Sequence, residues 1–117
     1  MCKGIGVDLC EISRMQRLLD SGHSLRRMFT EEEQAYIASK GASAAQTMAG
    51  LFAAKEAVLK ALGTGLTIAL TDIHVSHTEL GQPIVSLHGK AAEMGGQIIL
   101  SITHEGGMAA AFAVWEA

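Results

Sequence analysis

Residues 44–65, AAQTMAGLFAAKEAVLKALGTG, form the longest helical pattern in the chain. Successive residues of an α-helix are about 100° apart, and at that spacing the large apolar side chains fall on one arc. The pattern stops at Gly63-Thr64-Gly65, because glycine readily ends a helix. We therefore predict a long helix over residues 44–62. Its apolar arc comprises Met48, Leu51, Phe52, Val58, Leu59 and Leu62.

Three charged side chains interrupt this apolar helix. Lys55 falls inside the apolar arc, Glu56 lies at its edge, and Lys60 lies one turn beyond Glu56 on the same side. A charge on a buried face is costly unless it is paired or binds a ligand. The spacing allows two interpretations. One is a Glu56–Lys60 pair on the helix surface with Lys55 reaching out to solvent, and the other is a ligand site.

The N-terminal segment predicts a strand that presents a carboxylate. Ile5, Val7 and Leu9 alternate with smaller or polar residues and give the strand one apolar face. Asp8 points to the opposite face, between two small neighbours. It either caps the helix that follows or binds magnesium, which prefers carboxylates, waters and substrate phosphates. If this strand packs beside the long helix, Asp8 and Glu56 supply two carboxylates, and Lys60 faces the phosphates as a point charge.

The other segments complete an α+β pattern. Thr30 and Glu33 form a capping box, which predicts a helix from there to about Ser39. Apolar alternation around turn residues predicts two hairpins in the second half. We expect a single domain over residues 1–117, with helices early and antiparallel strands late. The further predicted elements are a helix over 11–19, strands over 72–77 and 84–87, a short helix over 89–96, and strands over 98–103 and 108–114.

Composition and charge limit the classes of partner and the cellular location that we expect for this chain. The formal net charge of −3 argues against nucleic acid as a partner. The N-terminus lacks the apolar core of a signal peptide, no apolar run is long enough to span a membrane, and the two cysteines form no disulfide framework. We therefore expect a cytoplasmic protein without membrane contact. The arginines are concentrated in one short stretch, which is either a solvated surface or a docking patch for an acidic partner. They are Arg14, Arg17, Arg26 and Arg27.

The histidines offer one candidate ligand contact. His74 and His77 are three residues apart in a predicted strand and should point to opposite faces, which disfavours a metal pair. His104 precedes the predicted turn at residues 105–107. It is either a surface turn histidine or a contact to an anion or to the adenosine part of a ligand.

Several motifs together resemble a known enzyme family. The most specific is the run over residues 52–65, FAAKEAVLKALGTG, and the second is GIGVDL at residues 4–9, followed by Glu11-Ile12 and Arg14. Weaker matches are Phe29-Thr30 with Glu33, the GQP at 81–83 and the SITH at 101–104. In order and spacing they resemble the holo-acyl-carrier-protein synthases, the short class of 4′-phosphopantetheinyl transferases.

This resemblance implies a magnesium-dependent transfer of 4′-phosphopantetheine from coenzyme A to a serine of an apo acyl carrier protein. The serine attacks the β-phosphorus, 3′,5′-ADP leaves, and the base is Glu56 or a metal-bound water. The implied catalytic residues are Asp8, Glu56 and Lys60, of which Asp8 and Glu56 hold Mg²⁺. The implied coenzyme A contacts are Lys55, Lys60, Gly63, Gly65 and His104. Arg14, Met15 and Leu18 would meet the acidic helix of the carrier protein.

The resemblance also implies a homotrimer, with active sites in clefts between neighbouring subunits, and a role in fatty acid biosynthesis. The sequence departs from the family pattern at Leu51, where an arginine is usual, and over the neutral segment 42–46. The loop after Gly65 is short and lacks a basic residue. These departures leave a second hypothesis, a catalytically weak or inactive relative that binds coenzyme A or a carrier protein.

Overall fold

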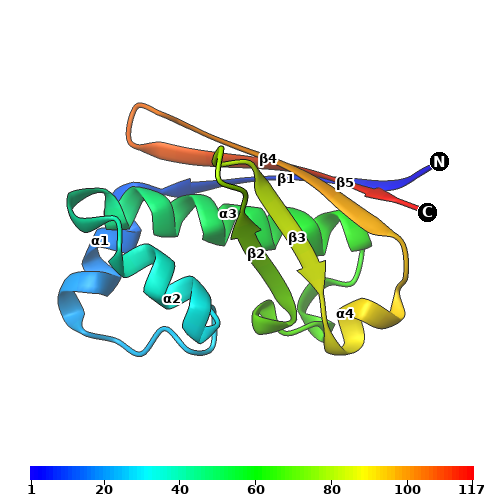
Figure 1. The fold of residues 1–117 in the computed structure, drawn as a ribbon, viewed down its shortest axis with the longest axis horizontal. Helices are drawn as coiled ribbons and strands as arrows, with labels where there is room; N and C mark the ends of the chain where they lie inside the picture. Colours follow the sequence, from blue (N-terminus) through cyan, green and yellow to red (C-terminus); the bar gives the residue numbers. More distant parts are fainter.

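The long central helix lies under one sheet and beside a separate hairpin (Figure 1). The computed structural model describes residues 1–117, except for the side chain of Leu66. Short 3₁₀ turns lie at Gly41–Ser43, Gly65–Thr67 and Leu70–Asp72. The helices and strands are β1 (Cys2–Glu11), α1 (Ile12–Ser21), α2 (Glu31–Ala38), α3 (Ala44–Leu62), β2 (Ile73–His77), β3 (Pro83–Leu87), α4 (Gly89–Glu93), β4 (Gln97–Glu105) and β5 (Met108–Glu116).

The α+β prediction is confirmed, and the sheet explains where the first strand belongs. The three-stranded sheet is antiparallel with the order β1-β5-β4, so the N-terminal strand pairs with the C-terminal one. This pairing runs along the whole of β1, which makes the strand longer than the alternation around Ile5, Val7 and Leu9 predicted. The predicted hairpins are present as β2–β3 and β4–β5.

The face of β1 that packs against α3 is made of small residues rather than the large apolar ones. A Cβ atom added to Gly6 would lie 1.9 Å from the carbonyl oxygen of Ala57, so only glycine lets the strand approach the helix this closely. The side chains of Ile5, Val7 and Leu9 therefore point to the outer face of the sheet. They are 60%, 56% and 64% exposed.

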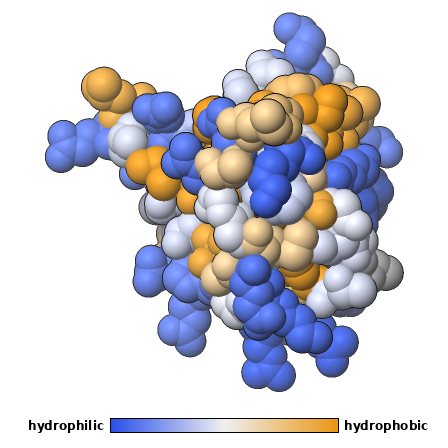
Figure 2. All heavy atoms as spheres, turned by 90° about the vertical axis from the view of Figure 1, so that its right-hand side faces the viewer, coloured by the Kyte–Doolittle hydropathy of each residue, from blue (hydrophilic) through white to orange (hydrophobic). Residues whose placement is uncertain are grey.

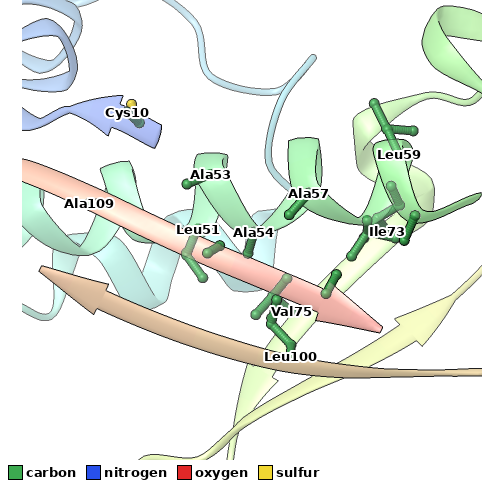
Figure 3. Close-up of a cluster of buried hydrophobic side chains, with 14 of the residues drawn as sticks. Cys10, Leu51, Ala53, Ala54, Ala57, Leu59, Ile73, Val75, Leu100 and Ala109 are labelled. Atoms are coloured by element: carbon green, nitrogen blue, oxygen red, sulfur yellow. The ribbon is translucent and has the colours of Figure 1, made fainter. Parts of the chain in front are cut away.

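The helix α3 is buried on nearly every side, which is typical of a central helix with apolar residues all round. Its large apolar side chains are buried, as the arc predicted, except that Phe52 is half-buried and lies beside Arg14 of α1. A second row of small residues faces the sheet, where it meets the alanines of β5 (Figure 3). This row comprises Gly50, Ala53, Ala54, Ala57 and Ala61.

The outer face of the sheet exposes a continuous apolar surface. Register places Ile5 and Ile99 on either side of Val114, and Val7 beside Phe112. Figure 2 shows apolar atoms gathered near its upper edge, on the side where the sheet lies in Figure 1. We call this surface the outer sheet face. Its exposed large members are Ile5, Val7, Leu9, Ile99 and Phe112.

Candidate functional site

Asp8 and Lys60 meet at the free edge of the sheet. Asp8 lies on the helix-facing side of β1, and Lys60 reaches it from the last turn of α3. The Lys60 Nζ donates to Asp8 Oδ1 and to the carbonyl oxygen of Val7, both at 3.0 Å. An open hollow of about 330 Å³ lies beside the pair, lined by these residues and Leu9. Asp8 does not cap α1, since that helix begins after Glu11 without a side-chain cap.

Glu56 lies one turn before Lys60 on the same flank of α3 and is half-buried. Lys60 forms its ion pair with Asp8, and no Glu56–Lys60 ion pair occurs among the described residues. The surface-pair interpretation of the Glu56–Lys60 spacing is therefore wrong. The structure brings Asp8 and Lys60 into contact, while Glu56 lies one helical turn before Lys60 and is not among the residues that line the hollow.

The donors on this flank fit a magnesium ion in their chemistry. Magnesium takes one or two carboxylates and completes its shell with water and substrate phosphates. Asp8 and Glu56 offer hard oxygen donors, and Asp8 borders the hollow, where its side chain is 17% exposed. No group of three or more potential metal ligands among His, Cys, Asp and Glu occurs in the described part of the chain. Phosphate and water oxygens would therefore have to supply most of the shell.

Lys55 lies on the opposite flank of α3, where its side chain is completely buried. Its Nζ donates to Glu33 Oε1 at 2.6 Å and to the carbonyl oxygen of Leu70 at 3.0 Å. Burial lowers the pKa of Lys55, and the hydrogen bond and charge of Glu33 oppose that shift. Because its ammonium is enclosed and already paired, Lys55 is not placed to touch coenzyme A. The structure overturns this prediction, and it equally overturns the interpretation of Lys55 as reaching out to solvent.

Glu33 is the centre of the polar network around Lys55. It closes the predicted capping box, accepting from the Thr30 amide at 2.8 Å while the Thr30 hydroxyl accepts from the Glu33 amide. Its second oxygen accepts from the backbone N–H of Val75 at 2.8 Å. One carboxylate therefore joins the start of α2 to α3 and to β2. The capping box correctly predicted the start of α2. It did not predict that Glu33 also binds Lys55 and Val75, because these residues are distant in the sequence.

His104 borders a second cavity, of about 200 Å³, between α2, α3, β4 and the β2–β3 hairpin. The missing side chain of Gly50 makes room for the imidazole, since a Cβ there would lie 3.2 Å from His104 Nε2. Leu51, which is buried, forms an apolar part of the wall. The cavity also has polar groups that sequence reasoning missed, because residues far apart in the chain supply them. They are Tyr36, Thr47 and His77.

Tyr36 and His77 stack across this cavity wall. Their ring centroids are 4.4 Å apart with an interplanar angle of 9°, and the Lys40 ammonium lies 4.6 Å from the Tyr36 ring centroid. Burial lowers the pKa of His77 from its ordinary value of 6.5, and the positive charge of Lys40 lowers it further. The imidazole is therefore held neutral at neutral pH.

The two parts of the predicted site lie on opposite flanks of α3. Asp8 is on β1 and His104 is on β4, and the central strand β5 separates these two edges. The strands β1 and β4 are therefore two strand spacings apart, which corresponds to about 10 Å. The helix α3 packs on the sheet face that carries Asp8 and His104. Among the described residues, His104 lines one of these pockets and Asp8 lines the other.

Gly63 and Gly65 follow α3 directly and are exposed. Gly63 ends the helix in the left-handed conformation, with φ of 72°, as the sequence predicted. The hydroxyl of Thr64, between them, is buried and has no hydrogen-bond partner among the described residues. The loop of Gly63, Thr64 and Gly65 therefore follows Glu56 and Lys60 directly after the end of α3.

The predicted carrier-docking residues on α1 differ in accessibility. Arg14 is exposed, with its guanidinium carbon 5.2 Å from the Phe52 ring centroid, and Leu18 is half-buried. Met15 is completely buried because this side of α1 packs on α3. The prediction that Met15 contacts a partner is wrong for that reason. No helix in the described part of the chain is long and apolar enough to cross a membrane.

Comparison with known proteins identifies relatives of the chain. The chain is 43% identical over 122 residues to the holo-[acyl-carrier-protein] synthase of Treponema denticola, covering 99% of each chain. It is also 43% identical over 126 residues to the synthase of Trichlorobacter lovleyi, covering 100% of this chain and 99% of that one.

Solved structures share the fold. The crystal structure of a holo-(acyl-carrier-protein) synthase from Bacillus anthracis in complex with CoA (3′,5′-ADP) matches with a TM-score of 0.84 and 35% identity, covering 100% of this chain and 98% of that chain. The Helicobacter pylori synthase in complex with coenzyme A matches with a TM-score of 0.84 and 27% identity, covering 96% and 99%. The family model described as the 4′-phosphopantetheinyl transferase superfamily matches residues 4–112. With this match across almost its whole length, the chain belongs to the 4′-phosphopantetheinyl transferase superfamily.

Proposed function

We propose that the chain is a holo-[acyl-carrier-protein] synthase. It transfers the 4′-phosphopantetheine group of coenzyme A to a serine of an apo acyl carrier protein and releases 3′,5′-ADP. The relatives named for this activity and the related structures with coenzyme A support the proposal. The observation in the structure that supports it most directly is the Asp8–Lys60 contact at an open hollow, one helical turn from Glu56 on α3.

The residues of this flank have distinct proposed roles. Asp8 and Glu56 hold Mg²⁺, which when bound neutralises negative charge on the diphosphate. Lys60 adds a positive charge. Its attraction to the diphosphate grows as the phosphate bond breaks and negative charge builds up on the leaving group. Glu56 is also a candidate to accept the proton of the attacking serine. Gly63 and Gly65 let the chain approach the diphosphate closely.

We also propose that residues 1–117 act as one domain and assemble as a homotrimer with sites between neighbouring copies. The placement of Asp8 and His104 at different pockets on opposite flanks of α3 supports this, because neighbouring copies could bring the two groups to one shared site. The outer sheet face supports it too, since exposed apolar surface of this kind typically becomes an interface. In that arrangement the cavity beside His104 receives the nucleotide end of coenzyme A.

Carrier-protein docking is proposed for the exposed side of α1. Arg14 and the half-buried Leu18 offer a positive charge next to apolar surface, which suits an acidic amphipathic helix. Arg14→Glu should raise the KM for the carrier protein by roughly ten-fold or more, while coenzyme A affinity changes little. Steady-state kinetics with each substrate varied in turn measures both, and equal losses for the two substrates would contradict a docking role.

The test of the function is mass spectrometry of an apo acyl carrier protein incubated with the protein and coenzyme A. We expect the carrier to gain one phosphopantetheine mass with magnesium present, and not with excess chelator. Asp8→Ala and Glu56→Ala should each lower the transfer rate by roughly a hundred-fold or more, with unchanged circular dichroism. We propose cytoplasmic fatty acid biosynthesis as the setting, so the acyl carrier protein of that pathway is the first substrate to test.

Two results would contradict the proposal in different ways. Full activity of Asp8→Ala or Glu56→Ala would remove the magnesium assignment. Absence of transfer by the folded protein would favour the second hypothesis, a binder of coenzyme A or carrier protein without turnover. One observation favours that hypothesis: Leu51 gives the cavity beside His104 an apolar wall where the family resemblance leads us to expect a positive charge.

A further inference from the structure

Lys60 and the proposed metal ion compete for the same carboxylate. The Lys60 ammonium lies 3.0 Å from Asp8 Oδ1 and is also held by the carbonyl oxygen of Val7 at 3.0 Å. That carbonyl belongs to an edge strand, so both acceptors are fixed parts of β1. Asp8 is thus partly neutralised by a group of its own chain. Glu56 has no ion pair among the described residues.

A lysine in this position weakens the site for a divalent cation. The metal would sit near Asp8, within a few ångströms of the Lys60 ammonium, and like charges at that separation repel. Binding the metal at Asp8 Oδ1 also requires the hydrogen bond from Lys60 to break. The carboxylates of this flank are therefore a poor site for a cation that arrives alone.

A diphosphate changes this balance. The Lys60 side chain is 56% exposed and has a flexible four-carbon stem, so its ammonium can turn toward a phosphate without leaving water. When it turns, Asp8 becomes free for the cation. The phosphate oxygens also supply ligands that the two carboxylates do not provide.

We propose that Lys60 is an internal counter-ion of Asp8, which makes the binding of a divalent cation and of a diphosphate mutually dependent. The inference rests on the proposed function, because it takes Asp8 as a metal ligand. It adds a role for Lys60 that is separate from its contact with the phosphates. A lysine that only contacted phosphate would leave the affinity for the cation alone unchanged.

The experiment measures binding without turnover. Calorimetry or proton relaxation gives the Kd of Mn²⁺, used as the probe cation, for the wild type and for Lys60→Met. We expect Lys60→Met to bind Mn²⁺ alone roughly ten-fold more tightly, because one nearby positive charge is gone. The second quantity is the ratio of the coenzyme A Kd without and with saturating Mg²⁺. By linkage this ratio should fall in Lys60→Met by a similar factor, although coenzyme A binds more weakly overall.

Three further variants make the result specific. Lys60→Arg keeps the charge and should bind Mn²⁺ alone as weakly as the wild type. Lys90→Met removes an exposed lysine of α4, changes the net charge equally and should leave the Mn²⁺ Kd unchanged. Thermal melting checks that every variant is folded. Asp8→Asn should abolish tight Mn²⁺ binding in both the wild-type and Lys60→Met backgrounds.

The outcomes separate this inference from the proposed function. If Asp8→Asn abolishes Mn²⁺ binding while Lys60→Met binds Mn²⁺ as the wild type does, only the counter-ion role is overturned. If Asp8→Asn binds Mn²⁺ as the wild type does, the magnesium site of the proposed function is overturned together with this inference. Tighter binding by Lys60→Met with an unchanged coupling ratio would also overturn it.

Discussion

At the residue scale, two lysines five positions apart on α3 have opposite environments. Lys55 is completely buried and bonded to Glu33, whereas Lys60 is 56% exposed and bonded to Asp8. The difference follows from helix geometry, since five residues turn the side chain to the other flank. The stability of a buried charge depends strongly on its ion-pair partner, whereas an exposed charge is also stabilised by water. The two residues should therefore respond differently to the same substitution.

Lys55→Met should lower the free energy of unfolding by about 3–5 kcal/mol, because it leaves the Glu33 carboxylate buried without its counter-ion. Lys60→Met is the matched control on the same helix. It should cost below about 1 kcal/mol, as is usual for an exposed pair. Chemical denaturation of both variants measures the difference. Equal destabilisation would show that the buried pair contributes no more than the exposed one.

At the element scale, α2 is held against β2 by polar and aromatic contacts rather than by apolar burial alone. Glu33 accepts the Val75 N–H, and one turn along α2 Tyr36 stacks on His77. Both contacts border the cavity walls on this side of the molecule. Of these two contacts, the Tyr36–His77 stack contains a titratable ring from β2.

Acid should weaken this contact. The pKa of His77 is lowered in the folded protein, so below its ordinary value of 6.5 the unfolded chain binds the proton more readily than the folded one. The contribution of a neutral His77 is thus present above that pH and is lost as the pH falls through the lowered folded pKa. His77→Phe keeps a ring on Tyr36 and does not titrate.

We expect the wild type to lose more unfolding free energy than His77→Phe between about pH 7 and about pH 5. Denaturant titrations at several pH values measure this, with His23→Phe, an exposed histidine beyond α1, as the control. Parallel pH profiles for the wild type and His77→Phe would contradict the prediction.

At the scale of the whole molecule, the proposed trimer accounts for both the outer sheet face and the divided site. The apolar side chains that alternate along β1 are exposed, while its glycines pack inside. A single chain thus leaves apolar surface uncovered on the side of the sheet away from α3. In the proposed trimer this face would be covered, and neighbouring copies would supply the two flanks of one site.

Phe112→Glu should convert the assembly to monomers, because burying several like charges in one interface is costly. Light scattering of the wild type should give about three times the chain mass of 12.3 kDa. Leu80→Glu is the matched control, since Leu80 is 98% exposed at the tip of the β2–β3 hairpin and lies off the outer sheet face. Transfer activity should be lost with the assembly in Phe112→Glu only. A wild-type monomer with full activity would contradict both the trimer and the shared site.

The sequence by itself determined most of the secondary structure and which element carries each charged residue. Helical spacing and the terminal glycine predicted α3 with the bounds that the structure has, and the capping box placed the start of α2. Alternation put Asp8 opposite Ile5 and Val7, and spacing put Glu56 and Lys60 on one flank. These are local properties, since each depends on the backbone geometry of a few neighbouring residues.

Only the tertiary structure decided which faces became core and which partners the charges found. The pairing of β1 with β5, the burial of Met15 and the Lys55–Glu33 contact each join segments that are distant in the chain or belong to different elements. The face of β1 that is buried is the one that carries Gly6, because the missing side chain lets the strand approach α3; the face with the larger apolar side chains is exposed. The reason is physical: local spacing orients a side chain, but the packing of distant elements determines what it faces.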